Sequence, residues 1–130
     1  MLKEYPTQQH KGDFKRRWFS SSYFDLIIWQ NDLSEITRFQ LCYDKQGQER
    51  ALTWTEGRDF DHNYIDDGET TPLRNETPVL LADGLFPAMV VLDKFIADSG
   101  VIEQQIRSFI IEKLNSAQRF YAAGSSPLTT

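Results

Sequence analysis

Residues 23–55 read YFDLIIWQNDLSEITRFQLCYDKQGQERALTWT, and this stretch decides the fold. It holds three runs rich in β-branched and aromatic residues, in which apolar side chains recur at every second position. That period is typical of a β-strand with one buried face. One side of the three predicted strands carries Phe24, Leu26, Ile28, Phe39, Leu41, Leu52 and Trp54. The other side is mixed and carries Asp25, Ile27, Trp29, Arg38, Gln40, Cys42, Ala51, Thr53 and Thr55.

The register between these strands follows from the apolar pattern and from the turns. A two-residue turn at Gln46 and Gly47, where glycine tolerates a positive φ, would join the second strand to the third. A shift by one residue would move every apolar side chain to the wrong face, so we expect a well-specified register. The predicted pairs are Leu26 with Leu41, Ile28 with Phe39, Trp29 with Arg38, Leu41 with Leu52, and Phe39 with Trp54.

Weaker strand patterns flank this stretch. Residues 14–19, FKRRWF, fit either a leading strand or a bend, and residues 1–13 fit a flexible N-terminal arm or an edge extension. Residues 59–66 can form a fourth strand, which would place His62 on the apolar side near the third strand. Residues 79–82 could add a short strand.

The period changes from two to that of a helix after Pro87. Proline suits the first turn of a helix, and apolar residues then recur at helical spacing until Gly100. We predict helices over residues 87–99 and 101–122, the second with one apolar stripe and one charged face.

These elements predict an α+β fold. An antiparallel meander of about four strands, residues 14–66, would pack its apolar face on the two C-terminal helices, because each layer hides the apolar face of the other. We expect one domain over residues 14–123 and a flexible tail over residues 124–130.

Composition narrows the class of protein. A chain of 130 residues can bury a core in a single domain, and the net charge of −5 argues against binding nucleic acid. The single cysteine favours a reducing compartment, and no apolar run is long enough for a membrane span. We expect a cytoplasmic protein that needs no cofactor.

The densest group of metal-ligand types lies in and after the predicted fourth strand. It comprises Asp59, Asp61, His62, Asn63, Asp66, Asp67 and Glu69. Calcium and magnesium prefer several oxygen ligands, which the carboxylates would supply. The spacing fails the helical calcium-loop pattern, because Tyr64 stands at the glycine position and Thr70 at the final glutamate position. The alternative is a solvated acidic hairpin.

His62 could act as a general base, because its ordinary pKa lies near neutrality. Asp61 or Asp59 would orient the ring, and Asp66 is a further candidate partner. The sequence names no nucleophile for such a hydrolase. The alternative is a structural histidine packed near Trp54.

The mixed face of the sheet is the second candidate site. Trp29 opposite Arg38 suits contact between a cation and an aromatic ring. Hydrogen-bonding and polar groups would surround this pair on a rigid platform, from Asp25, Gln40, Cys42 and Thr53. The alternative is an ordinary solvent-facing sheet whose Trp29 is covered by the N-terminal arm or by a second subunit. Cys42 itself fits a small buried apolar residue better than a nucleophile.

Two further clusters have simpler explanations. Lys15, Arg16 and Arg17 beside aromatic residues could contact phosphate, but a solvated sheet edge fits the acidic composition better. Ser20, Ser21 and Ser22 lack a glycine elbow that would present a nucleophile, and so predict a turn.

The motifs RRWF, YFDLIIW, FQLCYD, ERALTW and IDDGE occur in order between Arg16 and Glu69. With the later ADG and FPA, they resemble the signature of a family of small uncharacterised bacterial proteins. The resemblance implies a free-standing bacterial cytosolic protein. No activity, ligand or catalytic residue comes with it.

Two hypotheses for function remain. The first is a non-enzymatic binding module that uses the mixed face to contact a protein, a small molecule or a second copy of the chain. The second is a small metal-assisted or acid/base hydrolase at Asp59–Glu69.

Overall fold

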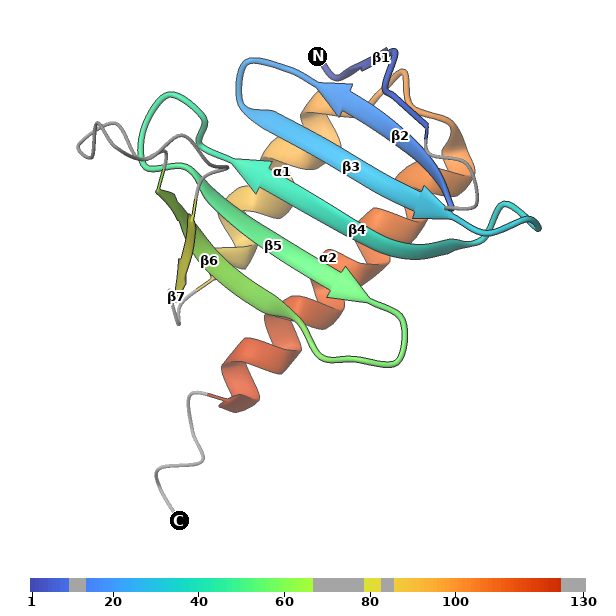
Figure 1. Ribbon diagram of the computed structural model, residues 1–130. Coiled ribbons are helices and arrows are strands. Elements are labelled where there is room, and N and C mark those ends of the chain that lie inside the picture. The colour runs from blue at the N-terminus through green and yellow to red at the C-terminus, as the bar shows by residue number, and fades with distance from the viewer. Residues whose placement is uncertain (10–13, 67–78, 83–85, 125–130) are drawn as a thin grey trace.

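The structure is a computed structural model that describes residues 1–9, 14–66, 79–82 and 86–124. Within these residues, seven strands form one antiparallel sheet in chain order (Figure 1). The strands are β1 (Lys3–Tyr5), β2 (Lys15–Ser20), β3 (Phe24–Gln30), β4 (Ile36–Tyr43), β5 (Arg50–Thr55), β6 (Asp61–Asp66) and β7 (Val79–Ala82). The α+β class is confirmed, but the expected number of about four strands is too low. The shortest additions, β1 and β7, lie at the two edges, where only one neighbour supports a strand.

Two helices follow the sheet and lie on the same side of it (Figure 1). They are α1, Ala88–Asp98, which starts directly after Pro87, and α2, Gln104–Gly124. Both therefore start and end within a few residues of the predicted positions. None of the helices in the described residues combines the length and the apolar composition needed to cross a membrane.

All the predicted pairs occur in the central strands. Leu26 lies opposite Leu41, which in turn lies opposite Leu52, and Trp29 lies opposite Arg38. The same registers pair Ile28 with Phe39 and Phe39 with Trp54.

The turn between β4 and β5 differs from the prediction. Pairing stops at Tyr43 and Arg50, so the connection is a wider loop over residues 44–49. The residue with positive φ is Asp44, at 59°, and not Gly47. The N–H of Gly47 donates to the carbonyl of Asp44 at 3.0 Å, which closes the turn. The register survives because it depends on the apolar pairs and not on the turn type.

A β-bulge interrupts the start of β4. Ile36 pairs with Gln30 and Arg38 with Trp29, which leaves Thr37 as the extra residue. In a strand without a bulge, strict alternation would place Ile36 and Arg38, which are two positions apart, on the same face. With it, Ile36 is buried and Arg38 is exposed.

The core lies between the sheet and the two helices. The sheet contributes Phe19, Phe24, Leu26, Ile28, Phe39, Leu41, Tyr43 and Leu52. The helices contribute Val91, Phe95, Ile106, Ile110, Leu114 and Ala117. Phe24 meets Phe95 of α1 edge to face at 5.9 Å, and Trp54 meets Phe109 of α2 at 5.3 Å between ring centroids. The helices therefore cover the apolar face, as predicted, and the mixed face is the outer face.

Part of the N-terminal segment belongs to this core. Residues 3–5 form β1, and the side chain of Leu2 is fully buried. The N–H of Leu2 donates to the carbonyl of Asp98 at 2.8 Å, which joins this segment to the end of α1.

Candidate functional site on the outer face of the sheet

The outer face carries all six residues predicted as a binding site. Three cross-strand rows contain them: Trp29 with Arg38 and Thr55, Ile27 with Gln40 and Thr53, and Asp25 with Cys42 and Ala51. The same alternation adds Arg16, Trp18 and Ser20 from β2. The three rows differ in exposure and in what their side chains contact, and the first borders an open hollow.

The first row contains a cation stacked on an aromatic ring. The guanidinium carbon of Arg38 lies 4.7 Å from the ring centroid of Trp29. Arg38 is exposed, and its side chain makes no hydrogen bond or ion pair with any described residue. The contact with the ring uses none of the guanidinium N–H groups as hydrogen-bond donors, so they stay available to an external acceptor.

An open hollow of about 440 Å³ adjoins this stacked pair. We call it the Trp29 hollow, and its lining residues are Phe14, Trp29, Thr37, Arg38, Thr55 and Glu56. Phe14 is 52% exposed, an unusual state for a large apolar side chain beside another aromatic residue. Thr37, the extra residue of the bulge, is also one of the residues that line the hollow.

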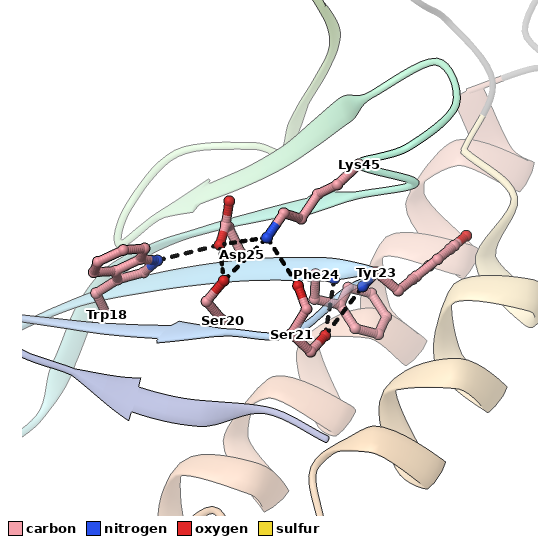
Figure 2. A network of polar contacts seen from close by, with 7 residues as sticks. All are labelled: Trp18, Ser20, Ser21, Tyr23, Phe24, Asp25 and Lys45. Atoms are coloured by element: carbon pink, nitrogen blue, oxygen red, sulfur yellow. Dashed lines mark hydrogen bonds and ion pairs between the residues drawn. The ribbon is translucent and has the colours of Figure 1, made fainter.

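At the other end of the face, Asp25 belongs to a closed polar network (Figure 2). Its Oδ1 accepts hydrogen bonds from Trp18 Nε1 at 3.2 Å, Ser20 Oγ at 2.5 Å and Lys45 Nζ at 3.2 Å. Lys45 also donates to Ser20 Oγ at 3.0 Å and to the carbonyl of Ser21 at 2.8 Å. Asp25 therefore ties β2 and β3 to the loop after β4, and does not approach the Trp29 hollow.

The network offers no activated serine. As an ammonium, the Lys45 side chain has no lone pair with which to take a proton from Ser20, and it donates hydrogen bonds to Ser20 Oγ, the carbonyl of Ser21 and Asp25 Oδ1. The hydroxyl of Ser21 accepts from the backbone N–H groups of Tyr23 and Phe24, which confirms the predicted turn.

Two of the predicted binding residues are buried on the outer face. Cys42 is 9% exposed and Thr53 is 7% exposed, and the smaller Ala51 between them in the sheet is fully buried. Burial raises the pKa of the Cys42 thiol to about 12, and the carboxylates of Glu49 and Asp25 act in the same direction. Cys42 is therefore a protonated, shielded thiol and not a nucleophile.

His62 lies on the inner face, where it is 6% exposed. Its Nε2 shares a hydrogen bond of 2.5 Å with the hydroxyl of Tyr43. Phe86 and Tyr121 surround the ring at centroid distances of 5.3 and 6.0 Å. This environment is that of a structural histidine, although its aromatic neighbours are these residues and its cross-strand partner is Leu52 rather than Trp54.

The acidic residues of the rival site lie elsewhere. Asp61 is exposed, because it precedes His62 on β6 and neighbouring strand residues point to opposite faces. Asp59 and Asp61 border a separate open hollow with Gly57 and Arg58. The structure thus does not bring Asp61 to His62.

The predicted metal cluster lies only in part within the described residues. Asp67 and Glu69 lie outside the described residues, as does the side chain of Asp66. In the part of the chain that is described, no three histidine, cysteine, aspartate or glutamate side chains gather around a metal position. A metal site at Asp59–Glu69 therefore stays a prediction.

The basic segment of β2 is divided between the two faces. Arg17 points inward, where it binds Glu4 of β1 at 2.7 Å and Glu103 before α2 at 2.5 Å. The hydrogen bonds with Glu4 raise the pKa of Arg17 and lower that of Glu4. Arg16 pairs across the sheet with Trp29, and its guanidinium donates to the carbonyl of Gln8. The three cations thus form no single phosphate-binding cluster.

Sequence reasoning missed three residues of the Trp29 hollow. Phe14 begins a stretch that fits either a leading strand or a bend, Glu56 follows the last residue of the predicted third strand, and nothing in the local pattern marks Thr37 as a bulge. Only the three-dimensional arrangement brings Phe14 and Glu56 to the same hollow as Arg38. No protein-family profile, curated protein or solved structure matches this chain.

Proposed function

We propose that this chain is a small non-enzymatic binding protein whose ligand or partner contacts the outer face of the sheet at the Trp29 hollow. The supporting observation is the stacked Arg38, whose guanidinium has no hydrogen-bond partner among the described residues and borders a partly apolar hollow.

The chemistry of this pair favours a ligand with a carboxylate. An arginine edge presents two parallel N–H groups that match the two oxygens of a carboxylate. The contact with the indole of Trp29 restrains the Arg38 side chain, so less side-chain freedom is lost on binding. Phe14 and Trp29 offer apolar surface for the remainder of the ligand.

A role in binding fits the outer face better than catalysis does. Its one cysteine has a pKa near 12, and Ser20 lies in the saturated network of Asp25 and Lys45. Neither group is activated for attack on a substrate. Tyr5 of β1 packs on Trp18 of the outer face at 5.2 Å between ring centroids. The alternative in which the N-terminal arm or a second subunit covers Trp29 stays a prediction.

Hydrocinnamate, a phenyl ring joined to a carboxylate, is a suitable first probe. In a titration followed by amide and indole NMR signals, we expect shifts at Trp29, Arg38 and Glu56. Replacing Arg38→Gln should weaken binding about tenfold, because a charge-assisted hydrogen bond contributes about 1.5–3 kcal/mol.

The matched control is Arg119→Gln, which removes another exposed arginine from α2 and should leave binding unchanged. Shifts that avoid the outer face, or equal affinities in the Arg38 and Arg119 variants, would rule out the proposed site.

A further inference from the structure

The Trp29 hollow contains two opposite charges that do not pair with each other. Arg38 and Glu56 both line it and both are exposed. Neither forms an ion pair with any described residue, and so their charged atoms lie more than 4.0 Å apart. The two charges are therefore both available to one ligand placed between them.

The backbone of Glu56 is held in place beside the bulge. Its N–H donates to the carbonyl of Thr37 at 2.9 Å, and Thr37 directly precedes Arg38. Thr37 Oγ1 is in turn 3.4 Å from the carbonyl of Trp29, to which it donates. The backbones of Arg38 and Glu56 are thus linked through Thr37, a residue of the sheet.

A ligand with a single charge would satisfy only one of these groups. An anion on Arg38 would also feel repulsion from Glu56, and a cation on Glu56 would feel repulsion from Arg38. A zwitterion avoids both costs and makes both attractive contacts.

We infer that the Trp29 hollow binds a small zwitterion of the amino-acid class that carries an aromatic or large apolar side chain. The carboxylate contacts Arg38, the ammonium contacts Glu56, and the side chain lies against Phe14 and Trp29. The volume of about 440 Å³ suits a molecule of this size. This inference rests on the proposed function and specifies its ligand.

Three probes that share one phenyl ring test the inference. L-Phenylalanine carries both charges, hydrocinnamate lacks the ammonium, and phenethylamine lacks the carboxylate. In NMR titrations at neutral pH we expect L-phenylalanine to bind about two- to fivefold more tightly than hydrocinnamate, the range of an exposed ion pair. It should bind about tenfold more tightly than phenethylamine, which loses the charge-assisted hydrogen bonds to Arg38.

Two variants separate the charges. Glu56→Gln should abolish the preference for L-phenylalanine over hydrocinnamate, and Arg38→Gln should abolish its preference over phenethylamine. Glu112→Gln on α2 is the control for a lost exposed carboxylate and should change neither ratio. Unchanged amide spectra outside the hollow would establish that each variant is folded.

The outcomes distinguish this inference from the proposed function. Hydrocinnamate binding as tightly as L-phenylalanine, with Arg38 still required, would overturn the zwitterion and leave an anion-binding face. Equal binding of N-acetylphenylalanine amide would point to a peptide segment and would also overturn it. If none of the probes shifted outer-face signals, both proposals would fail.

Discussion

The contact between Arg38 and Trp29 combines two properties of arginine that lysine lacks. Its planar group covers the indole ring by stacking, which contributes about 0.5–1 kcal/mol at an exposed position. The same geometry leaves the N–H edge exposed, whereas a lysine ammonium would present a point charge. A single side chain therefore shields Trp29 and makes the face receptive to an anion.

Trp29 and Trp54 occupy opposite faces of the sheet and should respond differently to truncation. Trp54 stacks on Phe39 and contacts Phe109, so Trp54→Ala should cost about 3 kcal/mol of unfolding free energy. Trp29→Ala should cost about 1 kcal/mol, because its main described contact is the exposed Arg38. Urea denaturation measures both values. A cost at Trp29 equal to that at Trp54 would identify Trp29 as part of the core.

The buried thiol of Cys42 makes stability depend on alkaline pH. Its pKa is about 12 in the folded chain, whereas the pKa of a cysteine in an unfolded chain is about 8.5. The folded state favours the protonated thiol. The free energy of unfolding that this preference adds is complete below about pH 8.5 and is lost as the pH rises toward about 12.

Urea midpoints between about pH 7 and 11 should therefore fall less steeply in Cys42→Ala than in the natural chain. The test compares the slopes of the urea midpoint against pH. A loss of stability from the smaller side chain that is the same at every pH therefore does not affect it. Tyr121, whose pKa burial also raises to about 12, remains in both proteins and supplies a residual slope. Parallel curves would show that the Cys42 thiol is not shielded.

Among the elements, β4 does most to arrange the side chains of the outer face. The backbone is irregular at both of its ends, and each irregularity affects which side chains reach that face. The bulge at Thr37 turns Arg38 away from the core. At the other end, Asp44 adopts a positive φ as the chain leaves the strand. The loop that follows carries Lys45 to the carboxylate of Asp25.

The positive φ of Asp44 predicts an inverted preference for glycine. Glycine normally destabilises a regular element relative to alanine, but alanine is strained in the left-handed region by about 1–2 kcal/mol. Asp44→Gly should therefore be more stable than Asp44→Ala by about 1 kcal/mol in thermal or urea unfolding. If the alanine variant were equally stable, the loop would have a different backbone conformation.

The whole molecule is a two-layer structure with its N-terminal edge tied to both helices. Leu2 hydrogen-bonds to the end of α1, and Arg17 joins Glu4 of β1 to Glu103 just before α2. These contacts hold the edge strand against the helical layer. The outer face meanwhile has no helix of the described chain over it (Figure 1).

Leu2 should therefore matter to global stability despite its place at the start of the chain. Leu2→Ala removes a fully buried side chain and should cost about 2–4 kcal/mol. Leu33→Ala makes the same chemical change at a side chain that is 78% exposed, and should change stability by less than about 0.5 kcal/mol. A tolerant Leu2→Ala variant would show that the N-terminal segment does not complete the core.

The amino-acid sequence predicts the strand faces, the register of β3 to β5 and the approximate positions of both helices, because these follow from short-range periodicity. It also identified the Trp29 and Arg38 pair, which depends on that register alone. Tertiary structure decided the rest. The bulge at Thr37 lets Ile36 pack in the core. The hollow brings together Phe14, which precedes β2, and Glu56, which follows β5. Such features depend on contacts between distant segments, whose energies leave no period in the local sequence.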